Sequence, residues 1–168
     1  ALAAPFAYRP GTPLLVRLFH GATTVSVEMG FAVIAFLSAW GLLIATYMLA
    51  RSMNGGILQG LVVMCTAAFS FFQVKFPLAA PTRIDVEAFF LITVATWLLV
   101  KNRPVLVLLI SCVGLFFKEF LIIPGALLVV AKAAEYLRTR TTEPLVWLIA
   151  AICLLFACFT IPRIAIPV

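Results

Sequence analysis

The chain has 168 residues, of which 65% are hydrophobic and only 11% are charged, and it carries a formal net charge of +6. Soluble domains contain about 25% charged residues, and a chain with so few polar groups cannot cover a water-exposed surface. The composition therefore excludes a water-soluble globular domain. It predicts an integral membrane protein of the all-α class, a multispanning bundle of transmembrane helices that forms one domain over residues 1–168.

The distribution of charges and cysteines excludes further classes of function. Basic residues gather at the ends of apolar runs and do not alternate with aromatic residues along a polar groove, so nucleic acid is not expected as a partner. All four cysteines lie within apolar runs and none has C-x-x-C spacing, which indicates small apolar fillers and no metal site. No cofactor is indicated, although a divalent cation is compatible with the sequence.

The first part of the chain predicts an interfacial segment followed by two spans. Residues 1–24 are mixed in character, and "TPLLVRLFHG" within them is typical of a short amphipathic helix that lies along the membrane interface. Residues 29–50 contain no charge and are long enough to cross a hydrocarbon core of about 30 Å. A turn at "SMNGG" leads to a second span over 57–74, where Gly56 and Gly60 form a small-xxx-small pair. We expect this pair to serve local packing, with docking of another membrane subunit as the alternative.

A polar connection leads from the second span to two short apolar runs. These runs are predicted as helices over 86–100 and 105–117, and the basic turn "KNRP" joins them. Neither run is long enough to span an ordinary bilayer with ease, so they either borrow flanking residues or lie where the bilayer thins. Pro104 suits the first position of the second helix, because its missing N–H has no partner to lose there.

The stretch "GLFFKEFLIIPG" (114–125) places Lys118 and Glu119 side by side in an otherwise apolar run. In one continuous helix over 105–131 each of these charges would lie near the bilayer centre, at a cost of about 2.5–3.5 kcal/mol. Pro124 would also remove a helical hydrogen bond. We therefore expect a break, with one helix ending near Phe117 and the next beginning at Pro124. The last spans are predicted over 124–138 and 145–161, so the short or broken helices fall around 88–117 and 118–138.

This layout assigns the connections to two membrane faces. One face receives the basic segments at residues 51, 101–103 and 132–143. The other receives residues 1–24, the connection over 75–87, and the pair at 118–119. Lysine and arginine are nearly balanced between the faces and favour the first as cytoplasmic by a small margin.

The second face gathers ionisable residues of both signs, namely Arg9, Arg17, His20, Lys75, Arg83, Asp85, Glu87, Lys118 and Glu119. Arginine and lysine suit an anionic headgroup or phosphate, and carboxylates can transfer protons. Simpler roles compete with this interpretation. Asp85 and Glu87 would complement the dipole of the helix that begins beside them, the arginines would anchor to headgroups, and residues 118 and 119 would form an ion pair.

Three stretches occur in an order that indicates a family. They are "PFAYRPGTPLLVRL" (5–18), "TRIDVEAFFLITVATWLLVKNRP" (82–104) and "GLFFKEFLIIPGALL" (114–128). The first carries an aromatic-Tyr-Arg segment, the second an aspartate and a basic turn at opposite ends of a short helix, and the third a Lys-Glu pair ahead of a proline. Together they resemble the GT-C-type integral-membrane glycosyltransferases, and the likeness covers about residues 5–135.

The resemblance implies a multispanning enzyme that moves a sugar from a polyprenyl-phosphate carrier to an acceptor on the extracytoplasmic side. Its expected partners are membrane lipid and the lipid-linked sugar donor, and a bacterial inner membrane is the simplest location. Tyr8, Arg9, Asp85, Lys118 and Glu119 match the family pattern, and Lys118 would face the lipid phosphate. Arg83 joins them as a candidate for substrate or lipid-phosphate binding.

The chain departs from the family in one respect. The family's catalytic carboxylate lies in the first extracytoplasmic loop, ahead of the Tyr-Arg segment, and this chain begins after that point. We therefore expect a fragment that lacks the first span and first extracytoplasmic loop, or a relative without catalysis, and the catalytic residue stays unassigned.

Two other functions compete with the enzyme. A non-catalytic transmembrane subunit of a respiratory, photosynthetic or secretion complex would explain the incomplete catalytic set. A transporter segment would explain the broken helices, although the two halves of the chain show no internal repeat. An acidic residue in a loop upstream of Ala1 would favour the enzyme.

Overall fold

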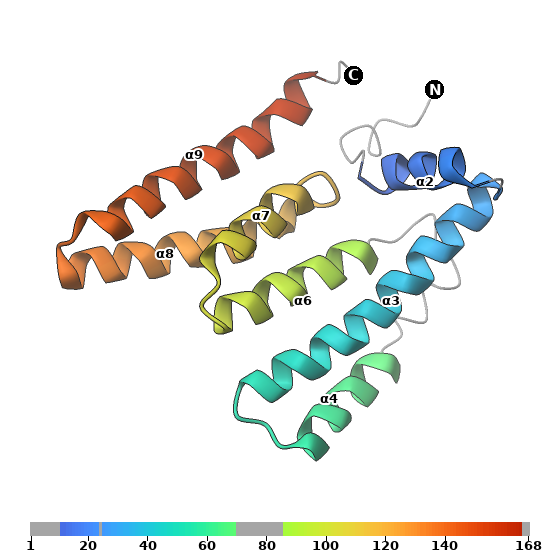
Figure 1. The fold of residues 1–168 in the computed structure, drawn as a ribbon, viewed down its shortest axis with the longest axis horizontal. Helices are drawn as coiled ribbons and strands as arrows, with labels where there is room; N and C mark the ends of the chain where they lie inside the picture. Colours follow the sequence, from blue (N-terminus) through green and yellow to red (C-terminus); the bar gives the residue numbers. More distant parts are fainter. Residues whose placement is uncertain (1–10, 24, 70–85, 166–168) are drawn as a thin grey trace.

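A computed structural model describes residues 11–23, 25–69 and 86–165, with side chains described as far as residue 160. Within these residues the chain forms seven α-helices, one 3-10 helix and no strand, which confirms the all-α class (Figure 1). The elements are α2 (Gly11–Ala22), α3 (Val27–Ser52), α4 (Ile57–Phe69), α6 (Val86–Val100), α7 (Pro104–Gly114), η2 (Glu119–Leu121), α8 (Ile122–Thr139) and α9 (Thr142–Ala165).

Three stretches of helix are long and apolar enough to cross a bilayer, which identifies the chain as an integral membrane protein. They are Val27–Ser52, Glu119–Thr139 and Thr142–Thr160. Their outer surfaces carry large exposed apolar side chains such as Leu37 and Phe156, as expected where the surrounding solvent is hydrocarbon. The helices α4, α6 and α7 are apolar but shorter, with 13, 15 and 11 residues.

Three helical hairpins turn at the same end of the bundle. The turns between α3 and α4, between α6 and α7, and between α8 and α9 all lie toward one side, as Figure 1 shows. Each turn contains one residue in the left-handed conformation, namely Asn54, Asn102 and Arg140, with φ of 63°, 53° and 57°. This arrangement confirms that the basic segments at residues 51, 101–103 and 132–143 share one end.

The core consists of two clusters that meet at α6. One cluster joins α6, α7, α8 and α9 around Val107 and Leu155, and the other joins α3 and α6 around Ala39 and Val86. Close approach of α3 and α6 depends on small residues, because a Cβ on Gly41 would lie 2.8 Å from the Phe90 ring. Without a hydrophobic driving force between helices in lipid, such close contact supplies the packing energy.

Most predicted spans match observed helices, with differences at their ends. The predicted helix over 86–100 coincides with α6, and α3 and α9 extend a few residues beyond the predicted spans 29–50 and 145–161. The predicted span 57–74 is observed as α4 as far as Phe69, and residues 70–74 lie outside the described residues.

The helices on either side of the predicted break differ from the prediction by two or three residues. Helix α7 ends at Gly114, three residues before Phe117, and α8 begins at Ile122, two residues before Pro124. The proline lies within the first turn of α8, where its missing N–H has no helical partner to lose. It therefore does not mark the first residue of the helix.

Candidate functional site

The chain breaks between α7 and α8, and we call residues 115–121 the break. The backbone N–H groups of Phe117 and Lys118 both donate to the Gly114 carbonyl oxygen, at 2.8 and 2.9 Å, so the last turn of α7 closes tightly. Lys118 is then fully extended, with φ −157° and ψ 142°, before the short η2 begins. This geometry confirms the predicted interruption and rules out a continuous helix over 105–131.

Packing beneath the break fixes its path. Leu121 is fully buried, and a Cβ on Gly114 would lie 2.7 Å from its Cδ2 atom. Leu115 is buried as well. Leu115 and Leu121 thus hold the two ends of the break against the core, while the residues between them lie at its edge.

Lys118 and Glu119 lie at this edge and are half-buried. Each interacts with another residue of the chain. Lys118 lies on extended backbone and Glu119 begins the 3-10 helix η2, so neither side chain is held by a regular α-helical turn. Irregular backbone at membrane depth is tolerated where protein or water covers it. Lys118 and Glu119 are therefore polar groups in an otherwise apolar region, which is a suitable position for binding a polar ligand.

Glu87 lies at about the same distance along the bundle as Lys118. The α6–α7 hairpin turns at residues 101–103, so Glu87 and Lys118 are separated from the turn by nearly equal numbers of residues. The ring of Phe89, one turn into α6, stacks on Phe120 of η2 with centroids 5.7 Å apart. This stack brings the first turn of α6 against the break.

The burial of Glu87 was not predicted from the sequence. This residue is only 4% exposed and interacts with another residue of the chain, whereas the sequence favoured a partner for the helix dipole over a role among the ionisable residues of the second membrane face. Burial of a carboxylate is costly unless its surroundings compensate, so such a group has a specific role more often than an exposed one. The available signal was an acid placed directly before thirteen uncharged residues.

An apolar groove of about 490 Å³ opens between α3, α4 and α6. Its lining includes Phe89, whose ring stacks on Phe120 in the break, and three threonines, Thr46, Thr66 and Thr93. Each threonine hydroxyl donates to a carbonyl oxygen one turn earlier in its own helix. Because these hydroxyls are satisfied within their helices, the groove presents a hydrocarbon-like surface.

The remaining sequence-predicted positions are distributed as follows. Tyr8, Arg9, Arg83 and Asp85 lie outside the described residues. Within the described part of the chain no group of three or more potential metal-ligating side chains comes together.

The two glycines of the predicted small-xxx-small pair, Gly56 and Gly60, have different surroundings. A Cβ on Gly60 would lie 2.8 Å from the Tyr47 ring in α3, whereas Gly56 is more open. Packing within the chain thus accounts for Gly60, and docking of a subunit there stays a prediction.

The opposite end of the bundle has a different character. The turns at this end and the helix ends beside them carry Arg51, Lys101, Arg103, Arg138 and Arg140. Nearby on α8, Lys132 forms an ion pair with Glu135 at 2.7 Å. The pair has i, i+3 spacing on one helix, with Glu135 exposed and Lys132 half-buried, and such a contact contributes about 0.5 kcal/mol or less. We therefore place the candidate site at the break and not at the basic end.

Comparison of this chain with protein-family models, with curated proteins and with solved structures finds no match.

Proposed function

We propose that the chain is the membrane core of a glycosyltransferase that moves a sugar from a polyprenyl-phosphate carrier to an acceptor on the extracytoplasmic side of a bacterial inner membrane. The observation that carries the proposal is the break. It has Lys118 on extended backbone and Glu119 at the start of η2, at the end of the bundle opposite the three basic turns. The Phe89–Phe120 stack holds this segment against the first turn of α6, which carries the buried Glu87.

Each part of the carrier has a matching feature in this arrangement. Lys118 would hold the phosphate through a charge-assisted hydrogen bond. The groove that includes Phe89 would hold isoprenoid units, because its surface demands no hydrogen bonds. Phe89 connects the two, since it lines the groove and its ring contacts the break. The resemblance adds Tyr8, Arg9, Arg83 and Asp85 as further contacts to the donor.

The enzyme is assigned no catalytic residue within this chain. A carboxylate beside the anomeric carbon would act as the base for the acceptor hydroxyl, as the resemblance implies. Glu119 and Glu87 serve in this proposal as charges that orient Lys118 and balance it in a medium of low dielectric constant.

The test is transfer from a polyprenyl-phosphate sugar in proteoliposomes that contain the protein together with any flanking segments it has in the cell. Lys118→Ala should lower transfer by about tenfold or more, because a charged hydrogen bond to the donor is lost. Lys132→Ala removes the same charge at the opposite end and should leave transfer unchanged.

Equal transfer by Lys118→Ala and the parent would reject the role of Lys118. Binding of the lipid-linked sugar that depends on Lys118 but leads to no transfer would favour the non-catalytic subunit.

A further inference from the structure

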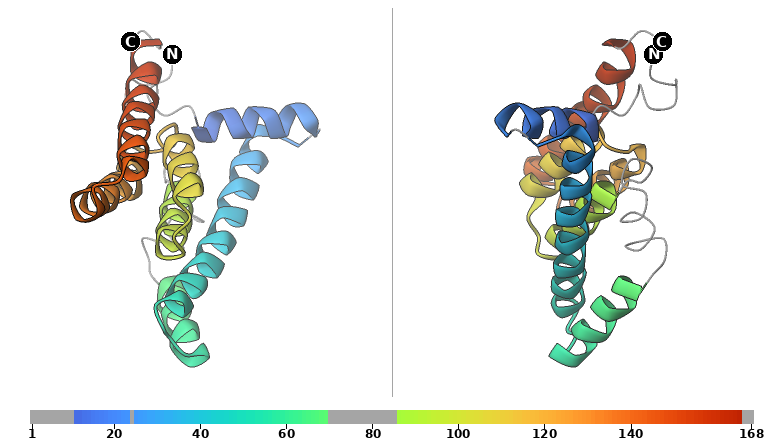
Figure 2. Two further views of the ribbon diagram at one scale, coloured as in Figure 1. Left: turned by 60° about the vertical axis from the view of Figure 1, so that its left-hand side comes forward. Right: turned by 90° about the vertical axis from the view of Figure 1, so that its right-hand side faces the viewer.

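Helix α2 lies across the end of α3. It ends at Ala22, and α3 begins at Val27, which opens one of the three candidate spans. The left view of Figure 2 shows α2 turned away from the axis of α3 at the end where α3 begins. An element that crosses the end of a span in this way lies at the level of the membrane surface and runs along it. The connection is fastened, because Nδ1 of His20 lies 2.7 Å from the carbonyl oxygen of Val25.

The surface of α2 is divided into three faces. Val16 is buried and packs on Gly30 of α3, where an added Cβ would lie 3.1 Å from a Val16 methyl group. Leu14 and Leu18 are 54% and 62% exposed and share a second face, because residues four apart lie above one another on a helix. Arg17 and His20 are exposed on a third face.

Lipid is the partner that these faces fit. The adjoining helix α3 also exposes large apolar side chains, which include Met29 and Phe36. A basic residue beside the leucines meets the phosphate level of a leaflet, where arginine is favoured. With only 12 residues, α2 is too short to span the bilayer itself.

The first residue of α2 is joined to the break. The N–H of Gly11 donates to the carbonyl oxygen of Phe116 at 2.9 Å. A Cβ at this position would lie 2.7 Å from the Phe117 ring and 2.9 Å from that same carbonyl oxygen. Gly11 is therefore buried against backbone as well as side chain, and no larger residue fits without a shift of the break.

From these contacts we propose that α2 is a membrane-surface anchor that positions the break. Its leucine face inserts into the headgroup–acyl boundary of one leaflet, and Gly11 transmits the position of α2 to Phe116 and Phe117. Gly11 is thus a positioning residue for the loop that carries Lys118. The inference does not depend on glycosyl transfer, and its tests read the position of the helix and of the loop.

The first test measures the depth of α2 in lipid. Spin labels are introduced singly at positions 14, 18, 17 and 20 of the full chain in liposomes that contain anionic lipid. Leu14 and Leu18 positions should be accessible to oxygen, which concentrates in lipid, and Arg17 and His20 positions to a water-soluble nickel complex. Nickel access at all four positions, or shielding of the leucine positions from both reagents by protein, would overturn the lipid assignment.

The second test measures coupling between α2 and the break. A reporter thiol is introduced by Phe116→Cys, in a background where the four native cysteines are replaced by alanine. The Phe116 side chain is not used in the contact with Gly11, whose partner is the backbone oxygen. Gly11→Ala should raise the rate of labelling by a water-soluble maleimide by about fivefold, the factor that loss of one ordinary hydrogen bond gives.

Gly21→Ala is the matched control, because an added Cβ there meets nothing within 4 Å. It should label at the parent rate, and equal rates for the two glycine variants would overturn the positioning role. A second variant, Leu14→Asn with Leu18→Asn, changes only side chains that are more than half exposed and should also speed labelling in liposomes. Unchanged labelling in that variant would show that lipid contact of α2 does not reach the break.

Discussion

Gly114 decides where α7 ends. A side chain at this position would collide with Leu121, which is fully buried and held by contacts on every side. The carbonyl oxygen of Gly114 also accepts two backbone hydrogen bonds that close the turn before Lys118. One residue thus provides both the space for the returning chain and the acceptor that ends the helix.

Substitution of Gly114 is expected to destabilise the fold. Gly114→Ala forces a Cβ to within 2.9 Å of the Leu121 Cβ atom, and overpacking of this kind costs roughly 1–3 kcal/mol. The melting temperature of the variant in detergent, followed by circular dichroism, should fall relative to the parent. Gly21→Ala, in open space, should leave the melting temperature unchanged or raise it, because alanine's higher helix propensity adds up to about 1 kcal/mol to the free energy of unfolding. A melting temperature for Gly114→Ala equal to that of the parent would show that Leu121 yields.

At the scale of single elements, helix ends were predicted well where charges flank an apolar run. Helix α6 coincides with its predicted bounds because Asp85 and Lys101 mark the limits of the run in the sequence itself. The end of α7 was placed three residues too far along, because Leu115, Phe116 and Phe117 are as apolar as the helix before them. The helix ends where Leu121 approaches Gly114 and where the Gly114 carbonyl oxygen accepts two backbone hydrogen bonds, and neither contact follows from the apolar pattern.

The turn after α8 contains conformational strain that a glycine would relieve. Arg140 is left-handed, with φ 57°, and its N–H donates to the Tyr136 carbonyl oxygen at 2.8 Å. Glycine is favoured at this position after a helix because it has no Cβ to resist a positive φ. Arg140→Gly should therefore stabilise the protein by about 0.5–1 kcal/mol.

Arg138→Gly makes the same chemical change two residues earlier, inside the last turn of α8. It should lower the melting temperature instead, since glycine costs about 1 kcal/mol within a helix. Thermal melts of the two variants, compared at equal net charge, measure the difference. Loss of stability in both would show that the guanidinium of Arg140 contributes more than its backbone costs.

At the scale of the whole molecule, the sequence predicted which segments share an end but not which residues touch. Apolar runs separated by charged turns determine the alternation of the hairpins, and the predicted face for residues 118 and 119 follows from that alternation. The contact of Gly11 with Phe116 joins residues that are far apart in the chain, and no local pattern indicates it. The stack of Phe89 on Phe120 could not be predicted either, because no local pattern distinguishes these two rings among the 15 phenylalanines of the chain.

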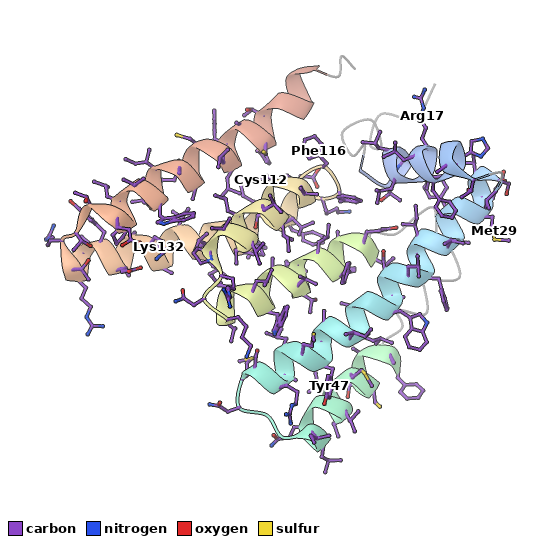
Figure 3. All side chains as sticks on the ribbon, in the orientation of Figure 1. Arg17, Met29, Tyr47, Cys112, Phe116 and Lys132 are labelled. Carbon is purple, nitrogen blue, oxygen red and sulfur yellow. The ribbon has the colours of Figure 1, made fainter. Side chains whose placement is uncertain are left out.

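The α6–α7 hairpin predicts a preference for thin bilayers. With 15 residues, α6 is about 22 Å long, compared with about 30 Å for an ordinary hydrocarbon core. The melting temperature in proteoliposomes should therefore be higher in dimyristoleoyl than in dierucoyl phosphatidylcholine, because the longer lipid increases the mismatch. A higher melting temperature in the longer lipid would contradict this expectation. Figure 3 shows the side chains of this hairpin and of the neighbouring helices.

The same shortness has a consequence for the lipid around it. When the outer end of α6 is level with one set of headgroups, Lys101 and Arg103 stop about 8 Å short of the opposite set. Their long side chains extend over part of that distance, and local thinning of the bilayer brings the headgroups to them over the rest. The leaflet beside this hairpin is then locally thinned, and a lipid phosphate there has a shorter stretch of hydrocarbon to cross than in the undisturbed bilayer.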